Sequence, residues 1–198
     1  MLFSKIFSGL AMAASAMAAA TPQQIADGIN SITQKSQALQ TPAQSITVLN
    51  APLIVIGQGP FPVLINGFTD IVSTASVLAA QIGSGSDAKK NENQKVHARD
   101  ISPRDPGADL VFNSFRAFVR VHQQLLNILI GKAGLITSVP FIGPPVATVL
   151  RSVESIVDQI AIGLIDQFQD RAVDLESEAN SLGATLDLTI QKYDGLTL

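Results

Sequence analysis

The sequence predicts an all-α protein, an antiparallel helical bundle of about five to six helices that could enclose an internal apolar cavity. Apolar residues recur at helical spacing through most of the chain, and prolines and glycines separate the periodic segments. No stretch alternates apolar and polar residues as a half-buried strand would. Since the chain has no Trp, one Tyr and nine Phe among 46% apolar residues, aliphatic and phenyl groups must form the core.

The first 20 residues have the features of a secretory signal peptide. Lys5 supplies a positive charge, residues 6–17 are apolar, and alanines 18–20 offer a small-residue cleavage site. We therefore expect 1–20 to be removed and 21–198 to form a single helical-bundle domain of a secreted protein, extracellular or in a cell wall. No stop-transfer flank follows the leader, and the last residues are too few and too polar to signal a lipid anchor.

Charge and cysteine content narrow the range of partners. The formal net charge of −3 gives no electrostatic reason to expect nucleic acid or an anionic membrane. Because there is no Cys, a secreted chain of this length depends on its core alone for stability.

Three helices are predicted in the first half of the chain. Thr21, Pro22 and Gln24 can form a capping box with proline at the first helical position, so a helix should begin there. The same signal recurs around Pro42, where two helices are expected to meet, and the second of these is expected to end near Pro52 or Gly57. A third helix is expected over about 63–82, with its apolar residues on one face.

The charge pattern changes abruptly after residue 82. Gln, Ser, Thr and Asn make the polar surface of 21–82, whose only charged residues are Asp27, Lys35 and Asp70. Residues 83–107 are rich in charge and are expected to form an exposed, flexible loop. A protease could cut at its dibasic pair, 89–90, although a solvated loop is the preferred interpretation.

Helices are also predicted on both sides of a long apolar stretch, 125–150. The first begins at 105–106 and ends at Gly131 or Gly134, and the next begins at 144–145. The stretch is long enough to span a bilayer, but its glycines and prolines favour two helices joined by an apolar loop.

The last apolar pattern is too long for one helix of a compact domain. It runs at helical spacing from Val146 to Ile190. A break is therefore expected between Gln169 and Gly183.

The residues that commonly carry catalysis are scarce. His97 and His122 are the only histidines and Cys is absent, which largely excludes thiol chemistry and multi-histidine metal sites. Glu154, Asp158 and Asp166 share one predicted helix, where a solvated face is a simpler interpretation than paired acid–base groups. We therefore expect that the protein is not an enzyme and that it has no catalytic residue, no metal site and no cofactor.

Two apolar loops and one histidine are the candidate binding features. Phe61 and Phe141 lie between prolines and glycines, where they could plug the bundle or form an exposed patch of the kind that marks binding sites. His122, on an apolar helical face, could be a hydrogen-bonded core residue or a contact for a carboxyl-bearing ligand. The predicted ligand-binding set is Phe61, Phe68, Phe112, Phe115, Phe118, His122, Leu126, Phe141 and Ile156.

Residues 118–127 (FVRVHQQLLN), 130–134 (IGKAG) and 144–147 (PPVA) resemble the fungal hydrophobic surface-binding protein A family, also called the cell wall galactomannoprotein family. The resemblance covers most of 21–198 and includes no catalytic signature. It implies a secreted or wall-associated helical bundle that adsorbs to hydrophobic surfaces, recruits polyester-degrading enzymes and holds fatty acids in an internal cavity. Two features depart from the family: the charged segment 83–109 is longer, and the Ser/Thr-rich wall-attachment tail is missing.

The expected function is that of a secreted, non-catalytic protein that binds fatty acids or other lipids in a bundle cavity, adsorbs to hydrophobic surfaces, or does both. The alternative is a structural or interaction protein of the fungal cell wall without a small-molecule ligand. The expected partners are an apolar ligand or hydrophobic surface, with a secreted hydrolase or a cell-wall polymer as further candidates. Neither a nucleic-acid partner nor a transmembrane segment is expected.

Overall fold

The computed structural model describes residues 20–50, 53, 56–92, 105–136 and 142–195. Within these ranges the chain is mostly helical and no strand occurs, which confirms the predicted all-α class. The helices are α1 (Pro22–Ala38), α2 (Gln40–Gln44), α3 (Pro60–Glu92), α4 (Pro106–Ala133), α5 (Gly143–Gln167) and α6 (Ala172–Asp194), with 3-10 turns η3 (Gly134–Ile136) and η4 (Gln169–Arg171).

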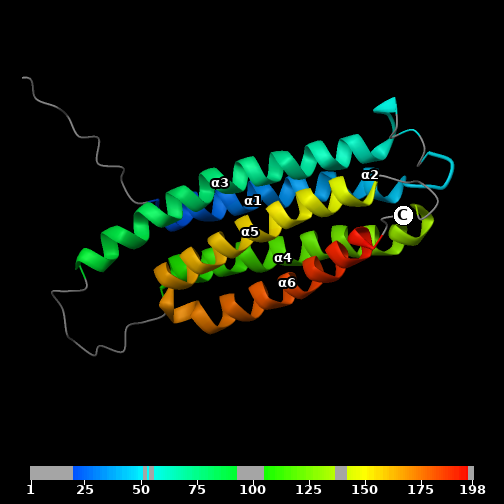
Figure 1. The fold of residues 1–198 in the computed structure, drawn as a ribbon. Helices are drawn as coiled ribbons and strands as arrows, with labels where there is room; N and C mark the ends of the chain where they lie inside the picture. Colours follow the sequence, from blue (N-terminus) through cyan, green and yellow to red (C-terminus); the bar gives the residue numbers. More distant parts are fainter. Residues whose placement is uncertain (1–19, 51–52, 54–55, 93–104, 137–141, 196–198) are drawn as a thin grey trace, which may run out of the picture.

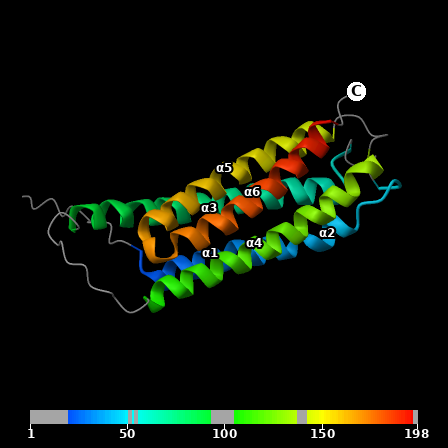
Figure 2. The same ribbon diagram turned by 90° about the horizontal axis from the view of Figure 1, so that it is seen from below.

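The long helices form a closed ring around the core (Figures 1 and 2). Helix α1 packs against α3 and α4, α6 packs against α4 and α5, and the contact of α3 with α5 completes the ring. The short α2 lies at one end, against α3 and α4. Each long helix therefore has two neighbours and one inward face, which is how a bundle buries an apolar stripe.

Consecutive long helices run in opposite directions, as predicted, but some neighbours in the ring run parallel (Figure 1). The start of α1 meets the start of α4, where Pro22 approaches Gly107. The later turns of α3 and α5 also meet. A Cβ on Gly163 would lie 2.7 Å from Ile82 Cγ2, so glycine permits this close approach.

The interior is built from aliphatic and phenyl groups of all the long helices. Its largest fully buried side chains include Phe61, Phe68, Phe115, Phe118 and Tyr193. The Tyr193 hydroxyl donates to the carbonyl oxygen of Leu129 at 3.1 Å, and burial raises the pKa of this phenol. Its polar group is thereby satisfied inside the core, as buried hydroxyls usually are.

The first helix begins as predicted, and the second is much shorter than expected. Gln24 N donates to Thr21 Oγ1 at 3.2 Å and Thr21 N donates to Gln24 Oε1 at 2.9 Å, so the capping box is formed. The helix expected at Pro42 is only the five-residue α2, and Pro42 lies within it rather than before it. Beyond α2, the side chains of Thr47 and Asn50 bond to the backbone, an arrangement that competes with helix formation.

Helix α3 begins earlier than predicted, and this places Phe61 inside the protein. Pro60 is the first helical residue, a position that does not need a backbone amide. Phe61 is 0% exposed. The prediction of an exposed apolar patch is therefore wrong for this residue, and its burial agrees with the alternative, in which Phe61 plugs the bundle. Phe141 lies outside the described residues.

Helix α3 also ends later than predicted. It continues through residues 83–92, so this part of the expected flexible loop, 83–107, is helical. The loop prediction failed here because alanine, lysine and glutamate favour helix as readily as they favour solvent. Residues 93–104 lie outside the described part of the chain.

The predicted boundaries of the later helices are largely confirmed. Asp105 caps α4, whose Gly107 N donates to Asp105 Oδ1 at 2.9 Å. Helix α5 begins one residue before the predicted proline pair. The break before α6 comes at Phe168, with φ −122° and ψ 64°, and continues through η4, at the start of the predicted interval.

We predict that Phe61→Ala lowers the free energy of unfolding by about 3–5 kcal/mol, because it leaves a cavity in a filled part of the core. Urea unfolding followed by circular dichroism measures the change. Val63→Ala is the matched control, since Val63 lies on the same turn and is 50% exposed. A loss at Phe61 no larger than that at Val63 would contradict the burial of this phenyl ring.

Candidate functional site

The predicted binding residues lie in three different environments. Phe68, Phe118 and His122 form one aromatic cluster, and Phe115 lies beside Phe118, with ring centroids 6.2 Å apart. Leu126 and Phe61 are also fully buried in the core. Ile156 is buried as well, Phe112 is half-buried, and Phe141 lies outside the described residues.

His122 is the polar centre of the aromatic cluster. It projects from α4 and is 0% exposed. The Phe118 ring lies one turn earlier on α4 at 5.2 Å between centroids, and Phe68 of α3 meets the imidazole edge-on at 6.1 Å. Ser36 of α1 completes the surroundings, with its Oγ 2.9 Å from His122 Nδ1. Three helices of the ring therefore converge on this side chain.

Ser36 Oγ lies within hydrogen-bonding distance of two groups, the carbonyl oxygen of Ile32 at 2.9 Å and His122 Nδ1 at 2.9 Å. If its hydrogen goes to Ile32 O, as is common for a helical serine, it accepts from Nδ1, and the imidazole proton is then on Nδ1. Nε2 is buried and has no hydrogen-bond partner among the described residues. Burial lowers the pKa of His122 to about 4, so the ring is neutral at neutral pH.

Phe112 belongs to a structural junction rather than to the aromatic cluster. The Arg171 guanidinium lies over the Phe112 ring at 5.0 Å from its centroid. Arg171 Nε donates to Asp109 Oδ1 at 2.8 Å, and Nη1 donates to Asp174 Oδ2 at 2.7 Å. These two carboxylates raise the pKa of the guanidinium, and the contacts join α4 to the start of α6.

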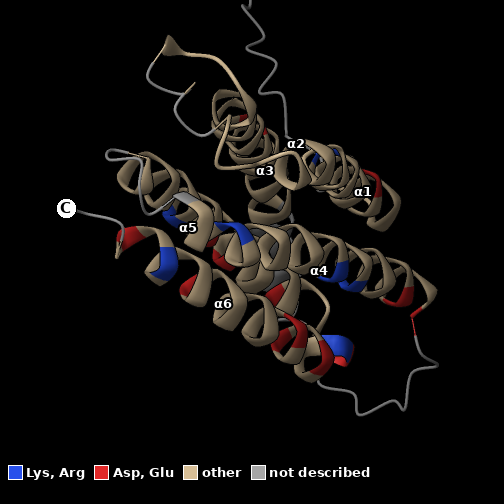
Figure 3. Ribbon diagram, turned by 90° about the vertical axis from the view of Figure 1, so that its right-hand side faces the viewer, with Lys and Arg blue, Asp and Glu red and all other residues tan. Residues whose placement is uncertain are grey.

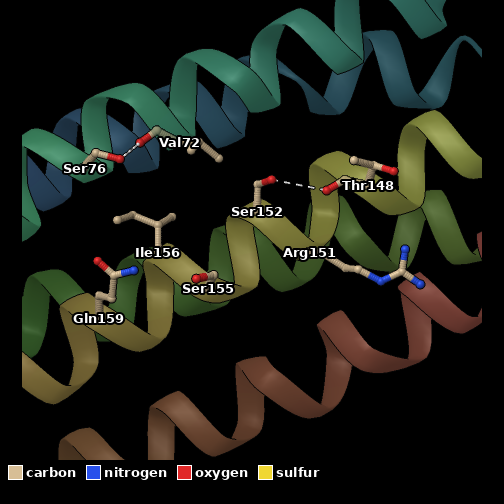
Figure 4. Close-up of a pocket in the computed structure, with 8 residues that line it drawn as sticks. All are labelled: Val72, Ser76, Thr148, Arg151, Ser152, Ser155, Ile156 and Gln159. Carbon is tan, nitrogen blue, oxygen red and sulfur yellow. Dashed lines mark hydrogen bonds between the residues drawn. The ribbon is translucent and has the colours of Figure 1, made fainter.

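A groove of about 480 Å³ lies between α3 and α5 (Figure 4). Val72 and Ile156 supply its apolar surface. Three of its hydroxyl groups donate within their own helices: Thr148 to Pro144 O, Ser152 to Thr148 O and Ser76 to Val72 O. The other residues that line it are Arg151, Ser155 and Gln159.

The loop that follows α2 exposes large aliphatic side chains at one end of the bundle. Val48 is 53% exposed, Leu49 91% and Ile56 66%. No charged residue occurs in 45–59. Figure 1 shows this loop at the same end as α2 and the last turn of α6. Together with Leu53, four of the exposed aliphatic side chains of the described residues therefore lie in one short, uncharged segment, whereas the others are spread over the helices.

Side-chain hydrogen bonds fix the turn that carries Val48 and Leu49. Thr47 N donates to Asn50 Oδ1 at 2.8 Å, and Asn50 Nδ2 donates to the carbonyl oxygen of Ser45 at 2.6 Å. From α4, Lys132 Nζ donates to the carbonyl oxygen of Ile46 at 2.9 Å. These bonds hold the backbone of the turn while its two central side chains face outward. We define residues 47–50 as the apolar turn.

Charged residues are distributed unevenly around the bundle (Figure 3). Most of those drawn lie on α4, α5 and α6, whereas α1, α2 and α3 up to residue 84 carry only Asp27, Lys35 and Asp70. Lys35 of α1 and Asp70 of α3 form an ion pair with each other. The segment Pro60–Ser84 of α3 is apolar enough and long enough to cross a bilayer, because hydroxyl and amide groups replace charges on its outer face. Its inward residues nevertheless belong to the core.

The carboxylates of α5 do not meet His122. Glu154 is partly buried, and this burial, a hydrogen bond to Asp187 and the charges of Asp187 and Asp158 raise the pKa of its carboxyl group. Asp187 belongs to α6, so Glu154 faces the outer seam between α5 and α6. Among the described residues, no cluster of His, Asp and Glu could hold a metal ion.

Sequence reasoning missed both the apolar turn and the α3–α5 groove. The apolar turn was assigned to a helix, although Thr47 and Asn50 have the spacing of a side-chain-bonded turn. Of the residues that line the groove, only Ile156 was predicted to bind a ligand, because Val72 and the six polar side chains belong to no motif. The sequence did offer one signal for this turn, since residues 45–59 contain several aliphatic residues and no charged residue.

Comparison with known proteins does not assign the chain to a family. No protein-family model matches it, and no curated protein matches it in sequence. The resemblance to the hydrophobic surface-binding family therefore stays a prediction.

We predict that His122 makes the protein less stable in acid. The pKa of His122 is about 4 in the folded state and about 6.5 when unfolded, so the unfolded chain binds a proton first as the pH falls. Stability from this group is complete above pH 6.5 and is lost between pH 6.5 and 4, by about 3 kcal/mol in total. Urea unfolding across this range, compared with His122→Phe, isolates the effect. Parallel pH profiles for the two proteins would contradict it.

Proposed function

We propose that this is a secreted, non-catalytic protein that adsorbs to hydrophobic surfaces and binds apolar ligands such as fatty acids or other lipids. The observation that carries adsorption is the apolar turn, where Leu49 is 91% exposed on a backbone fixed by hydrogen bonds. Exposed apolar groups that gather in one place usually mark an interaction site, whereas scattered ones need no explanation.

The geometry of the apolar turn suits contact with an extended apolar surface. Full burial of a Val or Leu side chain contributes about 1.5–3 kcal/mol. A backbone that is already ordered loses little conformational entropy when it binds. Since residues 45–59 carry no charge, no ionised group in this loop must be desolvated on contact. The proposed partner is therefore a hydrophobic surface, and a secreted hydrolase or wall polymer would be a further partner.

We predict that Val48→Ser combined with Leu49→Ser weakens adsorption to octyl-coated beads about tenfold or more, because two aliphatic groups leave the contact. Adsorption isotherms measure the change, and circular dichroism checks that helicity is kept. Val173→Ser is the matched control: Val173 is 79% exposed on the first turn of α6, at the other end of the bundle (Figure 1). Equal losses in the two proteins would place adsorption somewhere other than the apolar turn.

A second candidate is the binding of a lipid inside the bundle. The observation in its favour is the fully buried Nε2 of His122, which has no hydrogen-bond partner among the described residues and belongs to a ring in contact with Phe68 and Phe118. A buried polar atom without a partner is costly, and a ligand could satisfy it. We expect a lipid to be found by mass spectrometry of protein purified from its native host under non-denaturing conditions. Protein that carries no lipid and takes up no fluorescent fatty acid would exclude this candidate.

The proposal that the chain is a structural protein of a cell wall without a ligand makes a different prediction. Such a protein would adsorb to wall polymers and not to octyl-coated beads. The same bead assay, repeated with insoluble wall polysaccharide, therefore separates the two proposals. Adsorption to polysaccharide alone, unchanged in the Val48→Ser, Leu49→Ser protein, would favour the structural role.

A further inference from the structure

Two exposed aliphatic residues outside the loop 45–59 lie at the same end of the bundle as that loop. Val63 is 50% exposed on the first turn of α3, and Leu135 is 38% exposed in η3, directly after α4. Lys132 Nζ donates to Ile46 O at 2.9 Å and so joins the last turn of α4 to the loop. Figure 1 shows the loop, the start of α3 and the end of α4 together. We define the apolar end as the exposed residues Val48, Leu49, Leu53, Ile56, Val63 and Leu135.

Charged residues are absent from the segments that carry the apolar end. None occurs in 36–69 or in 133–150. On α3 the first charge is Asp70, which forms an ion pair with Lys35 of α1. Asp70 lies about 10 Å along the helix from Val63. The end of the bundle can therefore leave water to this depth on α3 before an ionised group of that helix is dehydrated.

The exposed groups of the apolar end face in different directions. Val48 and Leu49 project from the loop beyond α2, on a turn fixed by hydrogen bonds. Val63 belongs to a helix that runs along the bundle, so its side chain projects sideways from the axis of α3 (Figure 1). A flat, rigid surface can contact the loop or the side of α3, whereas a fluid layer can surround both. The apolar end therefore fits a deformable apolar phase, such as the acyl chains of a lipid layer.

One cation lies at the edge of the apolar end. Lys132 Nζ uses one hydrogen on Ile46 O, and no carboxylate of the described residues forms an ion pair with it. An ammonium group in plain hydrocarbon, without an anion, would be costly to dehydrate. The phosphates of a phospholipid layer lie just outside the acyl chains, where a lysine can reach them while its aliphatic stem stays in apolar surroundings. This cation therefore favours a phospholipid layer over an uncharged oil or a solid hydrocarbon.

We propose that the apolar end inserts into one leaflet of a phospholipid membrane, with its aliphatic side chains among the acyl chains and Lys132 at the level of the phosphates. This inference rests on the proposed adsorption to hydrophobic surfaces and names a fluid phospholipid layer as the partner. Insertion is shallow, about 5–10 Å as for other interfacial segments, and the ion pairs Lys35–Asp70 and Arg151–Asp194 remain in water. Helix α3 keeps its inward residues in the core and does not cross the bilayer.

Single tryptophans test the depth of insertion, because the chain has no Trp of its own. With phosphatidylcholine vesicles, Val63→Trp should show blue-shifted fluorescence that brominated phosphatidylcholine quenches. Val77→Trp is the matched control, which should show neither effect: Val77 is 61% exposed on nearly the same face of α3, about 21 Å further from the apolar end. Equal quenching at both positions, which means that α3 lies flat on the lipid or crosses it, overturns the inference. So does the absence of quenching at both.

Vesicle affinities test the chemistry of the partner. Val63→Ser should weaken binding to phosphatidylcholine about fivefold, because a half-exposed valine leaves the acyl region, and Val77→Ser should weaken it less than about twofold. Phosphatidylcholine should bind about fivefold more tightly than an uncharged galactosyl diacylglycerol, which offers Lys132 no phosphate. Equal affinity for the two lipids overturns the choice of a phospholipid, and equal losses in the two variants overturn insertion through the apolar end.

Three further outcomes separate this inference from the proposed function. Protein that does not bind phosphatidylcholine vesicles but still adsorbs to octyl-coated beads overturns the inference and leaves adsorption intact. Protein that binds neither removes both. Analytical ultracentrifugation shows whether a second copy of the chain covers the apolar end instead. A dimer of the unmodified protein that Val63→Ser dissociates would overturn the inference.

Discussion

Burial of the inward apolar faces of the long helices is the constraint on which the rest of the structure depends. The chain has no cysteine, so no disulfide supports the fold. Within the described residues, the ion pairs between helices, such as Lys35–Asp70 and Arg151–Asp194, join partly exposed side chains. Such pairs contribute about 0–1 kcal/mol each. The ring therefore depends on continuous contact among apolar side chains, and each helix must keep one apolar stripe facing inward.

This constraint explains which polar groups the interior contains. Tyr193, Thr189 and Ser36 reach backbone carbonyl oxygens, so their burial costs little. His122 differs from them, because among the described residues only one of its two ring nitrogens has a hydrogen-bond partner. The aromatic cluster therefore contains a buried polar atom whose burial is not offset by a hydrogen bond within the described part of the chain.

The sequence predicted those parts of the fold that depend on local signals. The capping box at Thr21, the start of α4 at Asp105 and the apolar face that carries His122 follow from short-range spacing, and the structure contains all three. Phe61 was harder to place, because two flanking prolines are as compatible with the first turn of a helix as with a loop. The turn of Thr47 and Asn50 was missed because its residues also fit a helical pattern.

The binding features depend on contacts between distant segments, and these left little trace in the sequence. Ser36 and His122 are 86 residues apart, so their hydrogen bond becomes visible only when α1 lies beside α4. The α3–α5 groove depends on the parallel contact of two helices whose order in the ring the sequence did not specify. Apolar periodicity predicts which face of a helix is inward, but not which helices meet there.

The uneven distribution of ionised groups has a consequence for how the molecule meets an oil–water boundary. Most charges drawn in Figure 3 lie on α4, α5 and α6, whereas residues 21–82 carry only Asp27, Lys35 and Asp70 among hydroxyl, amide and aliphatic groups. A molecule that meets such a boundary with this part of α1 and α3 keeps most of its ionised groups in water. The groups that lose water on this flank are then mainly neutral ones, whose dehydration costs less than that of ions.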